Sequence, residues 1–268
     1  MITDAHCHPA DLAEHFPAAE DQRRQLGVMC AASATTVEEF AYGERLSREA
    51  RDRNAAPLLP CFAVHPQMPA VSQLSVFDEQ LTMLNTLAAE GRLAAIGETG
   101  YDLFNGAYRE TEKIQDDLFA AHLETALRCD LPLVIHVRRA MHKIFAHSSA
   151  LKKCRAVVFH SWSGTAGEGE SLLKRGINAF FSFGNVIMLN HREAIRCCAV
   201  FPANRLLTET DAPFQPPRGK EFSCYTDIPR ILEAAAALRR EAGTEGATAQ
   251  ELEEIIESNF RAAFITGF

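Results

Sequence analysis

The sequence lacks the features that mark several large classes of protein. Its eight cysteines form no C-x-x-C pair, no apolar run approaches the about 18 residues of a membrane-spanning helix, and the start does not resemble a signal peptide. Glycine (15) and proline (12) are near average, which excludes fibrous and low-complexity classes. With 47% hydrophobic and 23% charged residues, the 268-residue chain is expected to be globular, cytoplasmic and without a membrane segment, its thiols reduced.

The chain also lacks an excess of positive charge. It has 27 Lys and Arg against 35 Asp and Glu, which gives a net charge of −8. This balance argues against a broad basic surface that binds nucleic acid by counterion release. It does not exclude a compact site in which bound cations offset phosphate charge.

Short apolar runs recur along the chain, and each is followed by a segment with helical spacing of its apolar residues. Continuous apolar strands that alternate with helices indicate a parallel sheet covered on both faces. Eight such units predict an α/β protein, a single (β/α)8 TIM barrel of one domain over residues 1–268, with a closing helix at Gln250–Phe264. The expected strands are Ile2–His6, Gly27–Ser33, Leu58–Val64, Ala94–Glu98, Leu133–Val137, Ala156–His160, Asn178–Phe183 and Arg205–Glu209.

A doubly wound, nucleotide-binding sheet could produce the same alternation of strand and helix. Its first strand should then be followed by a turn with clustered glycines. The turn after Ile2–His6 has none, so the barrel is favoured.

Residues able to bind metal stand at the carboxyl ends of five of the eight expected strands, where barrels build their sites. They are His6 and His8, Glu98, His136, His160 and Asp211. A lone histidine is more often a hydrogen-bonded core residue, and a lone carboxylate a helix cap. Because these residues gather at one end, a site for divalent Zn or Mn is favoured.

The other histidines are interpreted separately. His65 follows the third strand at the same end, so it is expected to face the substrate or to support a ligand. The remaining five lie in helical or loop patterns and are interpreted as structural: His15, His122, His142, His147 and His191.

Six motifs follow one another with the spacing of the expected strands. Together they resemble the TatD family, metal-dependent hydrolases of the amidohydrolase-like barrel group that are usually described as deoxyribonucleases. The resemblance continues through Arg218–Lys220 and Asn259–Arg261 and covers nearly the whole chain. The motifs are Asp4–Pro9, Ala63–Pro66, Ile96–Asp102, Val134–Arg138, Phe159–Gly164 and Leu206–Pro213.

The resemblance implies a site for two divalent metal ions, Mg, Mn or Zn. His6, His8 and Asp211 would hold one ion, His136 and His160 the other, and Glu98 would bridge or share them. Glu98 thus stands where related barrels use a modified lysine. Asp211 and Glu98 are the expected catalytic residues, with Asp211 orienting or deprotonating the attacking water.

Four further residues are candidates for substrate contact or support. Arg138 and Arg218 could bind a phosphate, or could belong to solvated loops. Trp162 could stack on a base, although core packing also explains a single tryptophan. Glu209 has the strand parity of Asp211 and could support an imidazole, or form a buried ion pair.

The presumed ligands are retained, but the substrate-facing loops depart from the usual family pattern. The departures are at Arg139, at Ser161–Ser163 and at Glu221–Ser223. Metal chemistry is therefore better supported than the identity of the substrate.

The sequence thus predicts a divalent-metal-dependent hydrolase of the TatD type, a phosphodiesterase or deoxyribonuclease that uses a metal-activated water. DNA or another phosphodiester is the expected partner, no membrane is expected, and the oligomeric state is left open. The alternative is a hydrolase of a small amide, ester or lactone, which the net charge of −8 and the altered loops favour. A metal-bearing barrel without catalytic activity ranks last, because no presumed ligand is missing.

Overall fold

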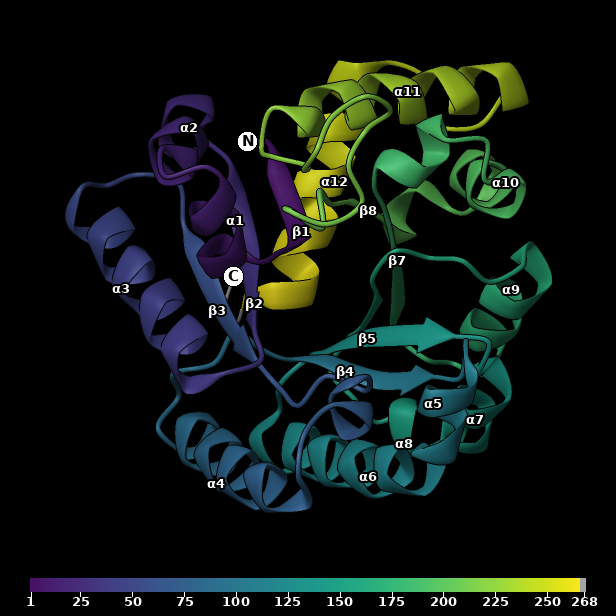
Figure 1. Ribbon diagram of the computed structural model, residues 1–268. Helices are drawn as coiled ribbons and strands as arrows, with labels where there is room; N and C mark the ends of the chain where they lie inside the picture. The colour runs from purple at the N-terminus through teal and green to yellow at the C-terminus, as the bar shows by residue number, and fades with distance from the viewer. Residues whose placement is uncertain (266–268) are drawn as a thin grey trace.

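Eight parallel strands form one sheet in their order along the chain, β1 to β8, in the computed structural model, which describes residues 1–265. The helices form a ring outside the strands (Figure 1). This arrangement confirms the (β/α)8 TIM barrel. The strands are β1 (Thr3–Cys7), β2 (Met29–Ala34), β3 (Leu58–Phe62), β4 (Ala95–Asp102), β5 (Leu133–Arg138), β6 (Val157–Phe159), β7 (Ala179–Phe183) and β8 (Leu206–Thr208).

The helices follow the strands as the apolar spacing predicts, and α12 confirms the closing helix. Two begin at a capping box, in which Thr36 pairs with Glu39 and Thr165 with Glu168. None of the helices within residues 1–265 has the length and apolarity needed to cross a bilayer. The α-helices are α1 (Pro9–His15), α2 (Ala19–Leu26), α3 (Val37–Asp52), α4 (Leu74–Ala89), α5 (Gly106–Glu110), α6 (Glu112–Cys129), α7 (Met141–Ala146), α8 (Ser148–Leu151), α9 (Ala166–Lys174), α10 (Arg192–Val200), α11 (Asp227–Ala242) and α12 (Ala249–Phe264), and the 3-10 helices are η1 (Met68–Ala70), η2 (Asn185–Met188) and η3 (Ala203–Arg205).

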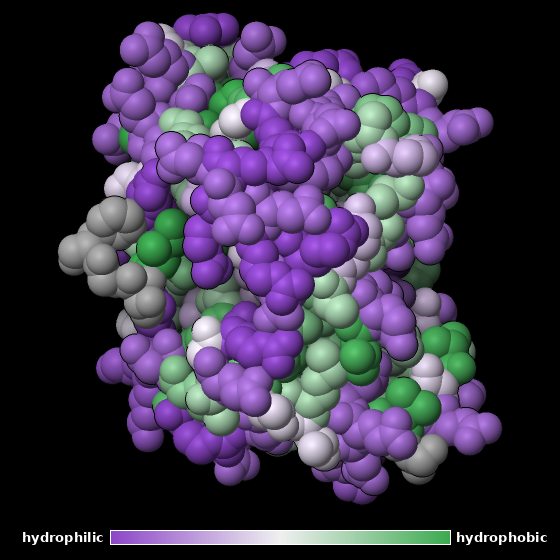
Figure 2. Space-filling view, turned by 90° about the vertical axis from the view of Figure 1, so that its left-hand side faces the viewer, coloured by the Kyte–Doolittle hydropathy of each residue, from purple (hydrophilic) through white to green (hydrophobic). Residues whose placement is uncertain are grey.

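The core has two layers. Inside the barrel, small and apolar residues such as Ala5, Val134 and Leu207 pack against Phe260 and Phe264 of α12, which covers one end. A larger cluster fills the space between the strands and the surrounding helices. On the face over α2 and α3 the surface is mainly hydrophilic, with apolar residues in small separate groups (Figure 2).

Backbone hydrogen bonds nearly close the barrel between β1 and the chain that follows β8. The Asp211 amide donates to the His6 carbonyl at 2.9 Å, and the His8 amide donates to the Ala212 carbonyl at 2.8 Å. The buried Asp4 carboxylate accepts from the Thr210 amide at 2.9 Å and from the Thr210 hydroxyl at 2.6 Å. Closure therefore places Asp211 directly beside the two histidines of the first motif.

The fourth strand is longer than the sequence indicates, and Glu98 lies in its middle and not at its end. Two glycines allow this. A Cβ atom on Gly97 would lie 2.4 Å from Cβ of Val134, and one on Gly100, whose φ is +132°, would lie 2.1 Å from the His136 carbonyl oxygen. Because β4 can approach β5 this closely, pairing continues as far as Asp102.

A buried histidine, His122 of α6, connects the segment after β3 with the middle of β4. Its Nε2 accepts from the Val64 amide at 3.2 Å, and its Nδ1 lies 2.6 Å from the Thr99 hydroxyl. Burial lowers the pKa of His122 from 6.5 to about 3, so the ring is neutral in the folded protein at neutral pH. This confirms a structural role for one of the histidines outside the strand ends.

His122 is expected to make the protein sensitive to acid. Below pH 6.5 the unfolded chain takes up a proton that the folded ring does not, so the free energy of unfolding falls by about 1.4 kcal/mol per pH unit as pH falls toward 3. Above pH 6.5 this contribution is fully present. Urea unfolding of the metal-free protein between pH 4.5 and 7 should show a shallower dependence for His122→Gln. The exposed His142→Gln should retain the wild-type slope, and equal slopes in all three proteins would contradict the expectation.

Candidate metal centre

A cavity of about 900 Å³ opens at the carboxyl ends of the strands. Five of the six presumed metal ligands line it, namely His8, Glu98, His136, His160 and Asp211. His6 is fully buried beside them. The barrel thus brings all six side chains to one place, from β1, β4 and β5 and from the segments that follow β1, β6 and β8.

Glu98 lies at the centre of this arrangement, and its two oxygens face different groups of histidines. Its Oε1 is 2.6 Å from His160 Nε2, 2.8 Å from His136 Nδ1 and 3.1 Å from His65 Nε2. His136 Nδ1 and His160 Nε2 are themselves 3.2 Å apart. These nitrogens therefore converge on one carboxylate oxygen.

The second oxygen of Glu98 faces the first motif. Its Oε2 is 3.2 Å from His6 Nε2 and 3.7 Å from His8 Nε2. Asp211 Oδ1 lies 3.5 Å from the same nitrogen of His6 and 3.6 Å from that of His8. The two imidazole nitrogens are 3.1 Å apart, so carboxylate oxygens and ring nitrogens surround a common point.

The donor set fits divalent cations. Imidazole nitrogen and carboxylate oxygen together suit borderline metals such as Zn and Mn. The candidate ligand atoms lie within 4.8 Å of one another in each of three groups: His6, Glu98 and His160; His6, His8 and Asp211; and His65, Glu98 and His136. Glu98 and His6 each belong to two of the three groups.

The two carboxylates are held in the ionised form. Burial acts to raise the pKa of Glu98, but the charges of His160, His65 and His6 outweigh it, and the pKa lies well below its ordinary range. Burial likewise acts to raise the pKa of Asp211, and hydrogen bonding to His8 with the charge of His6 brings it below the ordinary value. Both groups can therefore serve as anionic ligands.

The histidines of the centre differ in the direction in which their pKa values are shifted. Burial lowers the pKa of His6 and of His65, which favours the neutral ring that binds a metal. Burial acts the same way on His8, His136 and His160, but neighbouring carboxylates raise their pKa values above the ordinary one. Cations would have to displace protons from these three rings, so metal affinity should rise with pH.

Comparison with known proteins identifies the family of the chain. Residues 3–265 match the family described as TatD related DNase. This chain belongs to the TatD related DNase family. The membership of the TatD family that the sequence motifs indicate is thereby confirmed.

Individual relatives of this TatD family protein differ in how much of it they cover. It is 33% identical over 172 residues to the 3'-5' ssDNA/RNA exonuclease TatD of Erwinia tasmaniensis. The matched segment covers 60% of this chain and 64% of that protein. It is 27% identical over 276 residues to the uncharacterized metal-dependent hydrolase YcfH of Escherichia coli K12. This match covers 98% of this chain and 96% of that protein. The chain matches about half of the length of an uncharacterized metal-dependent hydrolase of Buchnera aphidicola and about two thirds of the Erwinia tasmaniensis protein. The crystal structure of YJJV, a TatD homologue from Escherichia coli K12, superposes with a TM-score of 0.82 at 26% identity over 99% of this chain and 98% of that chain.

Around the metal centre of this TatD family protein, most of the candidate histidine ligands have a polar group near the ring nitrogen that does not face Glu98. Ser33 Oγ lies 3.1 Å from His6 Nδ1, and Asp102 Oδ2 lies 3.1 Å from His136 Nε2. Glu209 Oε1 accepts from the Ser161 amide at 2.7 Å and lies 3.7 Å from His160 Nδ1, which is too far for a hydrogen bond; within residues 1–265 neither that nitrogen nor Glu209 Oε2 has a hydrogen-bond partner. Such groups orient ligands and fix their tautomers.

Sequence reasoning gave no role to Ser33, Asp102 or Gln215. Gln215 Nε2 donates to Asp211 Oδ2 at 2.6 Å. A signal for Asp102 was present in the third motif, because Asp102 stands four residues after Glu98 and alternation would return it to the same face. No pattern marked Ser33 or Gln215, which reach the centre from β2 and from an irregular loop.

Left-handed backbone occurs where the chain leaves the strands around the TatD centre. Ser161 (φ 45°), Asp211 (φ 53°) and Gln215 (φ 51°) all adopt it, as does Arg139 (φ 57°) after β5. Strained conformations of this kind persist where surrounding contacts over-determine them, as at functional sites. Here Asn185 Nδ2 donates to the Gln215 carbonyl at 3.1 Å and holds the loop that contacts Asp211.

The structure corrects the expectation that Trp162 could stack on a base. Its side chain is 1% exposed and packs edge-on against Phe159 at 5.5 Å and Phe181 at 4.8 Å between ring centroids. Although Trp162 borders the cavity, the indole belongs to the core. Core packing, the alternative open from the sequence, accounts for it.

Two arginines that could bind phosphate occupy different environments. Arg138 lines the cavity, and its guanidinium lies 3.5 Å over the ring of Phe104. Arg218 is exposed in the loop before α11 and is not among the residues that line the cavity. His191, interpreted as structural, does line it.

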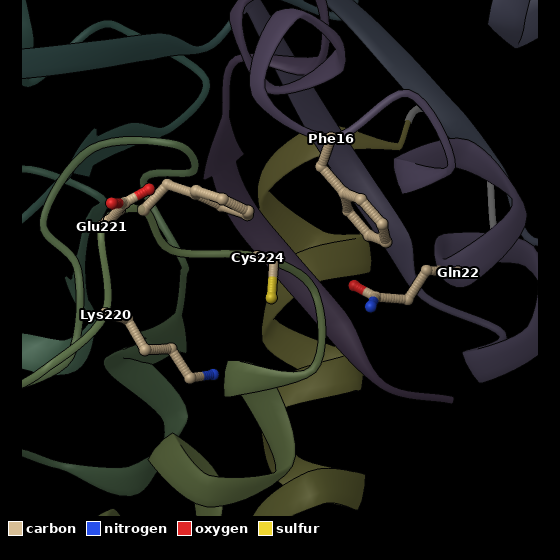
Figure 3. A pocket seen from close by; sticks show the side chains of 6 residues that line it. Phe16, Gln22, Lys220, Glu221 and Cys224 are labelled. Atoms are coloured by element: carbon tan, nitrogen blue, oxygen red, sulfur yellow. The ribbon is translucent and has the colours of Figure 1, made fainter.

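A smaller cavity of about 330 Å³ lies between the α1–α2 region and the loop before α11 (Figure 3). Phe16, Phe222 and Cys224 form its apolar part, with Gln22, Lys220 and Glu221 at the edges. It shares no lining residue with the large cavity. Within residues 1–265, none of its lining residues belongs to a group of candidate metal ligands.

Asp102 is expected to control metal affinity through His136. It accepts from Gln67 Nε2 at 2.7 Å and from the Phe104 amide at 2.8 Å in addition to its contact with His136. In Asp102→Asn an amide NH₂ must face one of these donors, so the ring loses its fixed orientation. We expect Zn²⁺ or Mn²⁺ to bind about 10-fold to 100-fold more weakly. Competition with a fluorescent chelator measures this, and the exposed Asp78→Asn is the matched control; equal affinities would contradict the role.

Proposed function

We propose that this TatD family protein is a phosphodiesterase that hydrolyses nucleic acid with two divalent cations. The proposal is supported chiefly by Glu98, whose two oxygens face two separate groups of imidazoles at 2.6–3.7 Å. A carboxylate placed in this way suits a bridge between two cations. The name of the Erwinia tasmaniensis relative, a 3'-5' ssDNA/RNA exonuclease, supports a single-stranded substrate.

In this proposal His6, His8 and Asp211 hold one cation, and His136 and His160 hold the other, with Glu98 between them. His65, 3.1 Å from Glu98 Oε1, would join the second group or contact the substrate. Divalent cations bound there would lower the pKa of water and stabilise negative charge on a phosphoryl oxygen. Mg, Mn and Zn are the candidates.

Three side chains near the cations have separate proposed roles, namely Asp211, Arg138 and Glu209. Asp211 directs Oδ1 toward His6 and His8 while Gln215 holds its Oδ2, so Asp211 is placed to orient or deprotonate the attacking water. Arg138 is fixed against Phe104 at the wall of the cavity, from which its N–H groups can reach a phosphate. Glu209, which faces Nδ1 of His160, would orient the imidazole of that residue.

The proposal extends to the domain organisation and the cellular location of the protein. We infer a single domain over residues 1–268, of which the last three lie outside the described residues, and a cytoplasmic location. The seven cysteines that are buried, and the absence of any disulfide within residues 1–265, suit a reducing compartment. A net charge of −8 suits local capture of substrate in a cation-filled cavity.

Metal removal tests the proposed function. Protein dialysed against EDTA should lose all cleavage of a single-stranded oligonucleotide, and Mn²⁺, Mg²⁺ or Zn²⁺ should restore it. Glu98→Gln, purified in parallel, reports contaminating nuclease. Bis-p-nitrophenyl phosphate and p-nitrophenyl esters are assayed beside it. Metal-restored turnover of the esters with none of either phosphodiester would overturn the proposal and favour the small amide, ester or lactone hydrolase.

A further inference from the structure

One large aromatic side chain at the wall of the metal cavity is exposed without an evident structural reason. Phe214 is 50% exposed, lines the cavity and stands three residues after Asp211. Its ring lies 5.2 Å from that of His8, with the two planes at 79°. A single exposed aromatic side chain is ordinary on a protein surface, but this one lies beside presumed metal ligands, where a molecule bound in the cavity can contact it.

The backbone around Phe214 is fixed on both sides. The Ser223 amide donates to the Pro213 carbonyl at 3.0 Å, and the Ser223 hydroxyl donates to the Phe214 carbonyl. Asn185 holds the carbonyl of Gln215. The ring is therefore held at the cavity by its own loop, and a ligand that contacts it need not order that loop.

A second exposed aromatic residue, next to Arg138 of the cavity wall, is already covered. Phe104 is 38% exposed, but the guanidinium of Arg138 lies 3.5 Å above its ring and that of Arg139 lies 4.7 Å away. Phe104 and Phe214 are the two aromatic residues among the exposed large hydrophobic side chains of the described chain. Within residues 1–265, no arginine or lysine lies over the ring of Phe214, which differs in this from Phe104.

We propose that Phe214 is a stacking platform for a nucleobase of the bound strand, next to the phosphate held at the metal centre. This inference rests on the proposed function and deepens it. An aromatic ring accepts any base, because every base has a π-face, so the platform gives affinity for single strands without sequence preference. It also needs no positive charge, which agrees with the net charge of −8. Phe214 thus takes the role for which the buried Trp162 is unsuited.

The test compares two strands that differ only in their bases. One is the octathymidylate d(T)8, and the other is an eight-unit strand of abasic tetrahydrofuran residues with the same phosphates. With Mn²⁺, Phe214→Ala should lower kcat/KM for d(T)8 by about 10-fold to 100-fold and leave the abasic strand unchanged. Phe214→Trp should retain or improve cleavage of d(T)8. The exposed Leu127→Ala on α6, outside the cavity, should change neither strand.

A binding measurement keeps this inference separable from the proposed function. Fluorescence anisotropy of the labelled strands with Mn²⁺-loaded protein should show Phe214→Ala weakening d(T)8 and not the abasic strand. If the wild type cleaves neither strand, the proposed function fails, and the anisotropy difference alone decides the stacking role. Equal losses on both strands, or no loss on either, would overturn the platform.

Discussion

Glu98→Gln should reduce hydrolysis at least about a thousandfold, because several kcal/mol of charge stabilisation depend on the cations that Glu98 helps to hold, and each 1.36 kcal/mol is a factor of ten. The substitution keeps the size of the side chain. It removes a charge that faces His160 and His136 through one oxygen and His6 through the other. An amide NH₂ directed at either group would repel a cation there.

Activity and metal content should fall together in this variant. Elemental analysis after loading and desalting should find fewer than the two ions per chain proposed for the wild type. The exposed Glu79→Gln on α4 is the matched control and should keep both ions and full turnover. A Glu98→Gln protein with wild-type turnover and metal content would refute the role of Glu98. Circular dichroism confirms that the variant is folded.

The strands could be predicted because a barrel buries both faces of each one, so that runs such as Leu133–Val137 stand out as continuously apolar. The gathering of the candidate ligands at one end of the barrel followed from the direction of the strands alone. Parallel strands end at the same side, so His136 near the end of one run and His160 at the end of the next had to lie near each other. Their Nδ1 and Nε2 atoms, respectively, are 3.2 Å apart. No knowledge of side-chain contacts was needed for this step.

The errors arose where a residue's role depends on partners far away in the sequence. The length of β4 depends on Gly97 and Gly100 meeting Val134 and His136, which no local pattern in 94–102 reveals. Trp162 follows a strand end, as a substrate-facing residue would, but its neighbours Phe159 and Phe181 come from two different strands and enclose it. Local position could not distinguish these outcomes.

The supports of the centre were missed for the same reason. Ser33 lies on β2 in an apolar run, and only the pairing of β2 with β1 brings it to His6. Gln215 contacts Asp211 because its backbone is left-handed and tied to Asn185. Ligands can be recognised by residue type and strand end, whereas the groups that hold them are ordinary residues whose position only the fold determines.

Asp211→Asn should lower kcat by about 100-fold to 10,000-fold, the range for loss of a general base, and this loss should remain at saturating metal. If Asp211 were a ligand only, excess Mn²⁺ would refill the site beside His6 and His8 and restore turnover. Titrating Mn²⁺ to saturation and comparing the limiting kcat of variant and wild type separates the two roles. Full recovery of kcat would limit Asp211 to metal binding.

Gln215→Leu should have a smaller effect of the same kind, about 10-fold to 100-fold, because it leaves the Asp211 carboxylate in place but removes the donor that fixes Oδ2. A carboxylate free to rotate spends less time with Oδ1 toward His6 and His8, so kcat should fall while KM for the oligonucleotide stays near the wild-type value. The exposed Gln250→Leu on α12 is the matched control. If Gln215→Leu in the Asp211→Asn background causes a further fall as large as it does alone, then Gln215 acts independently of Asp211, and the orientation of that carboxylate is not what Gln215 supplies.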